Sequence, residues 1–386
     1  MRTLGIDLGT SGVRAVVLDE HGEVASHAVP IAAAERTDPA ALWAGVAAVL
    51  HALDLSEVRA LAVDGTSGTL LSIDADAAAL GKLSLYDEPV PALARALGLQ
   101  ATSGVRRILH EADWIAGRLC GRFDTTDANN ALKTGYDPVA QAWTSDIGLR
   151  ALLPRVLSPG TPFATVTPAV SRCFGLPRGA IVAAGTTDGC ASFLSTGADA
   201  PGDAVTALGS TLTLKLLSGV PVSAPSFGIY SHLLLGHWLA GGASNSGGAV
   251  LAAYFTPIQL DALSRRIDPA HDSGLDYYPL ARPGERFPVN DPALSPRLSP
   301  RLSPRPADDT RFLHGLLEGI ARIEALGYRR LAEHGAPQVA RVLTVGGGAS
   351  NPVWAAIRAR ILGVPVLRAA ASAAHGSAML ARRALG

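Results

Sequence analysis

Hydrophobic residues follow two different spacings along this chain. Short, almost wholly apolar runs, such as residues 58–63 and 180–184, predict buried β-strands. Residues 42–53 (LWAGVAAVLHAL) repeat apolar positions at helical spacing, and Asp38-Pro39 just before them is typical of a helix start. Because strands and helical stretches alternate throughout, the pattern predicts an α/β protein.

The start of the chain carries the clearest local pattern. An apolar run at residues 4–6 ends in an acid, passes through the loop DLGTSG (7–12), and returns to an apolar run at 13–18. A turn at 19–22 then leads to a further strand, so we expect a β-hairpin followed by a third strand. Such a loop can wrap phosphate oxygens while its acid holds a hard cation, although an ordinary glycine-rich hairpin has the same residues.

The second half of the chain repeats this arrangement. Residues 204–217 read as strand, Leu208-Gly209-Ser210-Thr211 loop, and strand. At 386 residues the chain exceeds one ordinary core, so we predict two domains, residues 1–197 and 198–386. Two similar halves that face each other would bring both loops onto one phosphate chain.

Several further elements follow from the same patterns. Residues 105–119 look like an amphipathic helix with Trp114 in the core, and residues 312–331 form the longest helical pattern. Residues 342–345 predict a strand that opens into a Gly346–Asn351 loop and a helix. The Pro-, Arg- and Ser-rich stretch 283–306 predicts a surface spacer, with a basic interaction motif as the alternative.

Composition excludes several classes of protein. The chain is 48% hydrophobic and 17% charged with a formal net charge of zero, which indicates a packed globular protein without a field for nucleic acid or anionic membranes. Its only lysines are Lys82, Lys133 and Lys215, and none follows a glycine loop in P-loop spacing.

Cysteines and chain ends predict a cytoplasmic location. Cys120, Cys173 and Cys190 lie far apart without metal-ligand spacing, so we expect small buried residues in a reducing compartment. An acid at position 7 stands where a signal peptide needs an apolar core, and no run of about 18 apolar residues predicts a membrane span.

Five polar, glycine-rich clusters stand at predicted strand ends: 7–12, 64–69, 185–188, 209–211 and 346–351. In an α/β fold, loops at the carboxyl ends of strands are where ligands bind. One such cluster would be weak support, but five together predict a nucleotide site.

These stretches also resemble a known family. GIDLGTSGVRAVVLD resembles the first phosphate motif of the FGGY carbohydrate kinases, GDAVTALGSTLTLK the second, and VGGGASNPVWAAIRARILGVPV the adenosine motif. The passages LAVDGTSGTLL, HEADWIAGRLCGRF, NNALKTGYDP and AAGTTDGCASFLSTGA are similar to the small D-ribulose kinase and xylulose kinase-like branch. The resemblance spans nearly the whole chain. It implies two ribonuclease H-like domains of the actin-like ATPase type.

The resemblance implies roles for individual residues. Asp7 would hold Mg²⁺ through water and Asp188 would be the general base, with Ser67 near the sugar beside them. In the first phosphate loop, Thr10, Ser11 and Gly12 would bind the nucleotide. Thr10 would also be a catalytic residue. The second domain would hold ATP through Gly209, Ser210, Thr211, Gly347, Gly348, Asn351 and Trp354.

Chemistry supports these roles, and each has a structural alternative. Phosphoryl transfer needs positioned groups and charge neutralisation, and a fixed carboxylate can accept the proton of the sugar hydroxyl. Asp188 is equally a candidate helix N-cap, and Asp7 a turn carboxylate. Asp64 either lies near the sugar or stabilises its turn. Lys133 and Tyr136 either reach the sugar or pack between domains, and His110, His232 and His375 are expected to be structural.

The chain departs from the family pattern in two places. About twenty residues are missing after Tyr86-Asp87-Glu88-Pro89, in a segment that borders the sugar site of larger members. Ala371-Ser372-Ala373-Ala374 replaces a Thr-Glu-Ala-Ala-like turn. The shortening would widen the pocket, change the substrate or weaken activity.

The predicted function is ATP- and Mg²⁺-dependent phosphorylation of a ketopentose, D-ribulose ahead of D-xylulose. The alternatives are a kinase for D-xylulose or another sugar or polyol, and a degenerate ATP-binding protein with weak ATPase activity. We expect a sugar substrate, a monomer or homodimer, and no nucleic acid or membrane partner.

Overall fold

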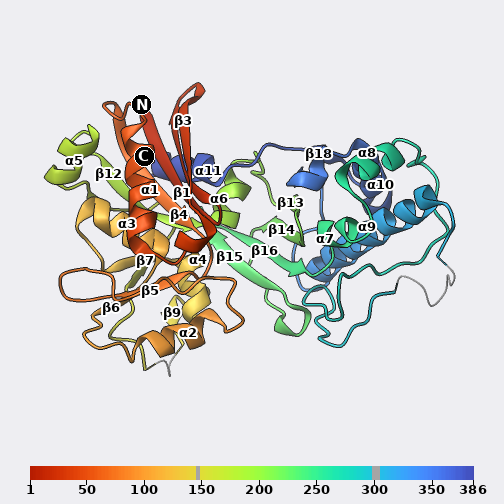
Figure 1. Cartoon of the computed structure of the whole chain (residues 1–386), viewed down its shortest axis with the longest axis horizontal. Coiled ribbons are helices and arrows are strands. Elements are labelled where there is room, and N and C mark those ends of the chain that lie inside the picture. Colours follow the sequence, from red (N-terminus) through yellow and green to blue (C-terminus); the bar gives the residue numbers. More distant parts are fainter. Residues whose placement is uncertain (145–147, 298–304) are drawn as a thin grey trace. The chain divides into compact units, whose positions relative to one another are not determined.

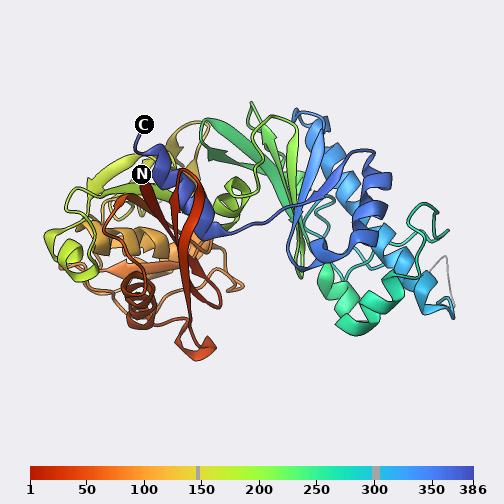
Figure 2. The same ribbon diagram turned by 90° about the horizontal axis from the view of Figure 1, so that it is seen from above.

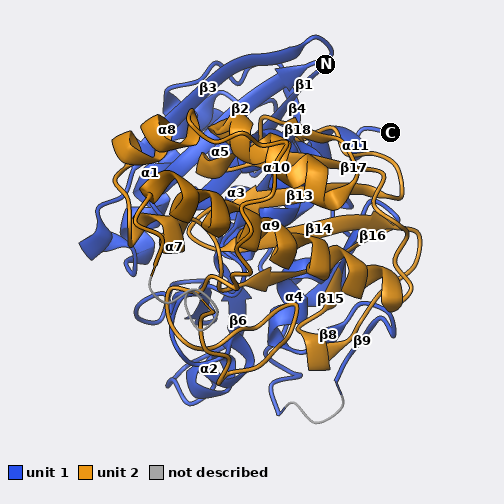
Figure 3. Cartoon of the chain, turned by 90° about the vertical axis from the view of Figure 1, so that its right-hand side faces the viewer, with its two compact units in different colours: residues 1–195, 232–236, 372–386 blue, residues 196–231, 237–371 orange. Residues whose placement is uncertain are grey.

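The computed structural model describes residues 1–144, 148–297 and 305–386, and these divide into two compact units (Figure 3). Unit 1 comprises residues 1–195, 232–236 and 372–386. Unit 2 comprises residues 196–231 and 237–371.

Unit 1 is built on a six-stranded mixed sheet with the order β11-β12-β4-β1-β2-β3 (Figure 1). β1, β2 and β3 form an antiparallel meander, and β4 and β12 extend it parallel to β1. The strands are β1 (Arg2–Gly9), β2 (Gly12–Asp19), β3 (Gly22–Pro30), β4 (Val58–Gly65), β11 (Pro162–Thr165) and β12 (Ile181–Thr187).

Alternate residues of β1 face opposite layers of unit 1. Leu4, Ile6 and Leu8 are buried in one core with residues of α1 (Pro39–His51) and α3 (Glu111–Cys120). Gly5 lies on the other face, where a Cβ would stand 1.8 Å from the carbonyl oxygen of Ala374, so only glycine admits the close helix. That helix is α11 (Ala373–Arg383), which comes from the end of the chain and packs on β1, β4 and α6 (Asp188–Leu194) (Figure 2).

Unit 2 repeats the strand pairing of unit 1. β13 pairs antiparallel with β14 and parallel with β17, just as β1 pairs with β2 and β4. The whole sheet has the order β15-β16-β14-β13-β17-β18. Its strands are β13 (Asp203–Leu208), β14 (Leu212–Ser218), β15 (Tyr230–Leu234), β16 (His237–Ser244), β17 (Arg341–Val345) and β18 (Val366–Arg368).

Helices of unit 2 enclose its core. The 25-residue α9 (Asp309–Glu333) buries one face against β14 and β16, and α10 (Pro352–Leu362) packs on α9. Two shorter helices, α7 (Gly248–Ala252) and α8 (Pro257–Ser264), lead up to α9.

Smaller elements complete the described structure. Three two-stranded sheets consist of β5 (Leu70–Ile73) with β6 (Arg107–His110), β7 (Thr125–Asp127) with β10 (Arg155–Leu157), and β8 (Tyr136–Asp137) with β9 (Ala142–Trp143). The remaining helices are α2 (Ala92–Leu99), α4 (Ala128–Ala131), α5 (Pro168–Phe174) and the 3₁₀ turns η1 (Ala33–Glu35), η2 (Leu132–Thr134), η3 (Pro225–Phe227) and η4 (Gly347–Ser350).

The α/β class, the opening meander, the strand–loop–strand at 204–217 and the long helix over 312–331 are confirmed. The single helix predicted over 105–119 is wrong at its start. Residues 107–110 form β6, because Ile108 and Leu109 are buried in an antiparallel pair with β5, and α3 begins only at Glu111. Trp114 is buried as expected.

Two other expectations are affected. Cys120 and Cys190 are buried, but Cys173 is exposed near the end of α5, so the expectation of three buried cysteines is wrong there. Part of the predicted spacer, residues 298–304, lies outside the described residues. None of the described helices has the length and apolar character needed to cross a membrane.

Candidate active site

Strand register in unit 1 brings carboxylates together at one end of the sheet. Asp7 of β1 is paired with Asp64 of β4, and Asp64 is paired with Thr186 of β12. Asp188 follows two residues after Thr186, as the first residue of α6. The parallel strands therefore end level, and their carboxyl ends place Asp7, Asp64 and Asp188 in one neighbourhood.

Asp7 is held in place by its cross-strand partner. Its side chain is only 5% exposed, and Arg14 Nη1 of β2 donates to Asp7 Oδ2 at 3.1 Å. Burial raises the pKa of Asp7 and outweighs the opposing effect of the Arg14 guanidinium. The Arg14 guanidinium and the neighbouring Asp64 side chain together set the surroundings of this carboxyl.

Asp64 lies beneath Asp7 and does not reach solvent. Its Oδ2 accepts a 2.5 Å hydrogen bond from Ser377 Oγ of α11, and the residue is completely buried. Burial first, and the charge of Asp7 second, raise the pKa of Asp64 well above its usual range. Of the two sequence interpretations of Asp64, the structural one fits this burial.

Asp188 is half-buried and electrostatically close to the other acids. Thr187 is the N-cap residue of α6, so Asp188 lies inside the first turn, where its Oδ1 accepts the N–H of Gly189 at 2.6 Å. The negative charge of Asp188 contributes to the raised pKa of both Asp64 and Glu111. The N-cap alternative is thus not the arrangement seen.

The first glycine loop has the geometry of a phosphate cradle. Thr10 and Ser11 are exposed at its tip, and Arg14 Nη2 donates to Ser11 Oγ at 3.2 Å. Gly12 has a φ of +151°, and a Cβ there would lie 2.2 Å from the Val29 carbonyl oxygen. Only glycine fits this close backbone approach, which leaves small side chains and N–H groups at the tip.

Ser67 follows β4 in the same unit. Its Oγ is buried and, within the described part of the chain, has no hydrogen-bond partner. Buried hydroxyls without a partner are uncommon, so a ligand or a water is the natural partner. Tyr136, in contrast, packs edge-on against Trp143 of the same unit, with ring centroids 5.4 Å apart.

Sequence reasoning missed one acid of this neighbourhood. Glu111, the first residue of α3, is 6% exposed, and burial with the charges of Asp188 and Asp7 raises its pKa to about 7. Its position was hidden inside the helix predicted over 105–119. The one available signal was an acid directly before the Ala112-Asp113-Trp114 segment of a passage that resembles the family.

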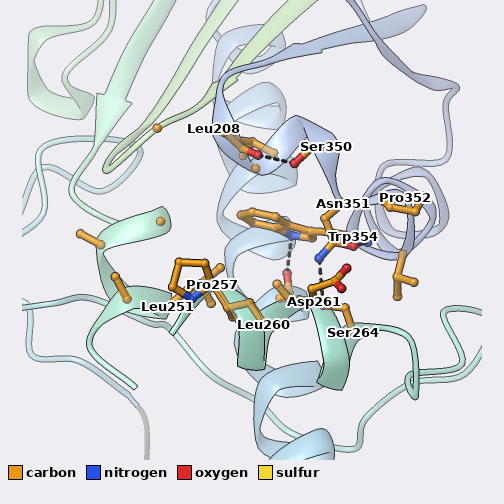
Figure 4. Close-up of a pocket in the computed structure, with 18 of the residues that line it drawn as sticks. Leu208, Leu251, Pro257, Leu260, Asp261, Ser264, Ser350, Asn351, Pro352 and Trp354 are labelled. Atoms are coloured by element: carbon orange, nitrogen blue, oxygen red, sulfur yellow. Dashed lines mark hydrogen bonds between the residues drawn. The ribbon is translucent and has the colours of Figure 1, made fainter. Parts of the chain in front are cut away.

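A separate pocket lies within unit 2 (Figure 4). Its volume of about 780 Å³ is in the range of pockets that enclose a nucleotide-sized ligand. The buried Trp354 forms its floor, with the indole N–H donating to the Leu317 carbonyl at 3.2 Å. Asn351 caps α10 through Oδ1 and donates from Nδ2 to Ser264 Oγ at 2.9 Å, which fixes the wall next to the indole.

Glycines from two loops line this pocket. A Cβ on Gly348 would lie 2.6 Å from the Trp354 ring, so the backbone rests directly on the indole. Gly209, Ser210 and Gly347 also line the pocket. Thr211 is exposed at the end of the same loop but is not part of the lining.

The predicted site residues therefore fall into two groups. Unit 1 carries Asp7, Thr10, Ser11, Gly12, Ser67 and Asp188, and unit 2 carries Gly209, Ser210, Thr211, Gly347, Gly348, Asn351 and Trp354. No group of three or more His, Cys, Asp or Glu residues in the described ranges has the arrangement of a metal cage. Mg²⁺ is commonly bound by one or two carboxylates, keeps several waters and is completed by phosphate oxygens, so a buried carboxylate such as Asp7 suits it.

Comparison with known proteins shows which sequences this chain resembles. Residues 205–385 match the FGGY family of carbohydrate kinases, C-terminal domain. The chain is 24% identical to the xylulose kinase of Escherichia coli over 420 residues, covering 93% of this chain and 84% of that protein. It is 25% identical to the xylulose kinase of Klebsiella pneumoniae, covering 94% and 85%.

The fold matches solved structures over its full length. The crystal structure of a xyloylose kinase from Brucella ovis superposes with a TM-score of 0.86 at 22% identity, covering 100% of this chain and 90% of that one. The family match over residues 205–385, the sequence similarity to xylulose kinases over most of the chain and the shared fold all make this chain similar to the sugar-phosphorylating FGGY carbohydrate kinases.

Proposed function

We propose that this protein transfers the γ-phosphoryl group of ATP to a hydroxyl of a ketopentose, with D-xylulose as the first candidate and D-ribulose as the second. The sequence motifs placed D-ribulose first. The full-length relatives named xylulose kinases support the reverse order. The observation that carries the proposal is Asp188, a half-buried carboxylate at the end of β12 beside Asp64 and Glu111.

Asp188 is proposed as the general base. The acceptor hydroxyl gives its proton to the Asp188 carboxylate as its oxygen bonds to the γ-phosphorus, and the bond from that phosphorus to the β-phosphate oxygen breaks to release ADP. A positioned carboxylate contributes about 10²- to 10⁴-fold to such a step. Its place in the first turn of α6, directly after a buried strand, keeps it fixed for this task.

The remaining predicted residues hold the nucleotide in this proposal. Asp7 would bind Mg²⁺ through water, and the metal when bound would neutralise phosphate charge. Thr10, Ser11 and Gly12 would contact the phosphates from unit 1, and Gly209, Ser210 and Thr211 from unit 2. The pocket at Gly347, Gly348, Asn351 and Trp354 would take adenine and ribose, because it is large, mainly apolar and edged by fixed polar groups.

The test is ADP release measured with a panel of acceptors: D-xylulose, D-ribulose, L-ribulose and glycerol. We expect the greatest acceptor-dependent rate with D-xylulose. Asp188→Asn should lower this rate by about 10²- to 10⁴-fold while ADP binding stays intact. Turnover above a tenth of wild type would remove Asp188 from the base role. ATP hydrolysis that no acceptor stimulates would favour the degenerate ATP-binding alternative.

A further inference from the structure

Glu111 is placed against the loop that follows β4. A Cβ on Gly65 would lie only 3.0 Å from Cγ and Oε1 of Glu111, so the glycine lets this carboxyl approach the strand end. Oε1 accepts the backbone N–H of Thr66 at 2.7 Å and the hydroxyl of Thr66 at 2.5 Å. These two bonds fix the carboxyl in one orientation.

A chain of hydrogen bonds occupies one oxygen of Glu111. With the carboxylate ionised, the Thr66 hydroxyl donates to Oε1, so it accepts at its 2.6 Å contact with Thr69 Oγ1. Thr69 Oγ1 in turn accepts the N–H of Tyr86 at 3.1 Å. The whole chain therefore ends on Oε1 and leaves Oε2 for another partner.

Glu111 lines a small cavity beside the first glycine loop. Within the described part of the chain, no hydrogen bond is made to Oε2, although the residue is only 6% exposed. Glu111 lines a cavity of about 20 Å³ together with Gly9, Thr10 and Leu85. That volume holds a single water or hydroxyl group.

The shortened segment closes one side of this cavity. Arg95 of α2 is buried and donates to the carbonyl oxygens of Gly68 (2.7 Å), Ser84 (3.0 Å) and Val90 (2.9 Å). These bonds tie the segment that contains Leu85 onto the loop after β4. The missing residues therefore do not leave this part of unit 1 open, and Leu85 remains an apolar wall of the cavity.

The charges around Glu111 indicate what kind of group binds there. Asp188 and Asp7 act on it with like charge, and Tyr86 lies close enough for Glu111 to affect its titration. Arg36 lines the same cavity, but its guanidinium is paired with Asp87 at 3.4 Å. An anionic ligand oxygen would meet net negative charge, whereas a neutral hydroxyl can both donate to and accept from a carboxyl.

We propose that Glu111, through Oε2, binds a hydroxyl of the acceptor sugar and makes this cavity a hydroxyl-recognition subsite of unit 1. This inference rests on the proposed sugar kinase function and assigns a specificity-determining residue to it. An acceptor that places a hydroxyl in the cavity gains a hydrogen bond to a fixed, desolvated carboxyl. An acceptor without that hydroxyl leaves the carboxyl oxygen without a hydrogen-bond partner. An unpaired polar group of this kind discriminates strongly between acceptors.

Steady-state kinetics of Glu111→Ala, Glu111→Gln and the surface control Glu57→Gln test this proposal. With D-xylulose or D-ribulose, Glu111→Ala should raise the KM of the sugar by about 10- to 100-fold and change the KM of ATP less than about twofold. Glu111→Gln keeps the Oε1 bonds to Thr66 and should show a smaller rise. The rise should also be smaller with glycerol, which offers fewer hydroxyls, and Glu57→Gln should match wild type.

Each other outcome overturns the inference. If the folded Glu111 variants keep the wild-type sugar KM while wild type phosphorylates a ketopentose, the subsite is wrong and the proposed function stands. If the variants raise the Mg²⁺ requirement or the KM of ATP as much as that of the sugar, Glu111 serves the nucleotide. If wild type shows no acceptor-stimulated ADP release with any sugar or polyol, the inference and the proposed function both fail.

Discussion

The two units share a strand plan but differ in how they treat buried charge. In unit 2, the buried Glu324 of α9 is paired with Arg358 of α10 through two bonds of 2.6 and 2.7 Å, and Thr206 donates to the same carboxylate. In unit 1, the buried Asp64 and Glu111 receive hydrogen bonds only from hydroxyl and N–H groups. The carboxylate of Glu324 is therefore compensated by a cation, whereas the carboxyls of Asp64 and Glu111 are not.

This difference indicates where chemistry is expected. Uncompensated acids with raised pKa values are typical of functional sites, whereas a compensated pair is typical of a structural core. The strand ends agree with this division, because β1 and β4 end near acids while β13 and β17 end in glycine loops around an apolar pocket. In the proposed function, the same backbone plan would support a reacting centre in one unit and a binding pocket in the other.

Breaking the buried pair of Glu324 and Arg358 should give the largest change in stability. Arg358→Met should lower the free energy of unfolding by about 3–5 kcal/mol, because Glu324 would remain buried without its cation. Chemical denaturation measures this. The control Arg122→Met removes an exposed pair with Asp124 and should change stability by less than about 1 kcal/mol. Equal effects of the two variants would contradict the distinction between buried and exposed pairs.

Asp7 tests whether the chemistry depends on unit 1. Asp7→Asn keeps the shape of the side chain but loses its charge, so kcat/KM should fall by about 10²- to 10³-fold. ADP binding measured without Mg²⁺ should stay at the wild-type level, since the pocket is formed by unit 2 alone. Asp19→Asn, at an exposed turn of the same meander, is the control and should leave both unchanged. A loss of metal-free ADP binding in Asp7→Asn would contradict this division of labour.

Local sequence signals predicted most of the scaffold. Short apolar runs separated by turns predicted the opening meander, and glycine–hydroxyl loops marked the β1–β2 and β13–β14 turns. The error at residues 107–110 arose because a four-residue strand directly before a helix has too few residues to show its own period. Its pairing with β5, more than thirty residues earlier, decides its conformation.

The chemistry that depends on distant residues was less predictable. Asp64 has a raised pKa because it is buried next to Asp7, and α11 brings Ser377 to it from the far end of the chain. Glu111 matters because Thr66 and Gly65 meet it across 45 residues or more. No local sequence pattern encodes either of these long-range contacts. The sequence therefore predicted the loops correctly but not the residues that pack around them.

The pH dependence of stability sharpens the contrast in buried charge. The pKa of Glu111 is raised from 4.5 to about 7, so between these values the folded state holds more protons than the unfolded state. Stability contributed by this group is therefore present at pH 4.5 and is lost as pH rises toward 7. Glu111→Gln removes this loss, and its stability relative to wild type should increase between pH 5 and pH 8 by at most about 3 kcal/mol.

Denaturation curves at several pH values measure that difference. Glu57→Gln, at an exposed position paired with Arg2, should run parallel to wild type across the range. A constant offset between Glu111→Gln and wild type at every pH would show that Glu111 is compensated in the way that Glu324 is.

The smallest expected effect concerns the pocket of unit 2. Gly348→Ala places a methyl group 2.6 Å from the Trp354 ring and 2.9 Å from Leu208 Cβ, so the indole must shift into the space that the adenine would occupy. We expect the KM of ATP to rise by about tenfold, the usual scale for one misplaced methyl group. Gly179→Ala, where nothing lies within 4 Å of the added group, is the matched control. Because Gly348 belongs to unit 2 and the carboxylates to unit 1, the KM of the sugar should not change, and an equal rise for both substrates would mean that the pocket and the reacting centre do not act separately.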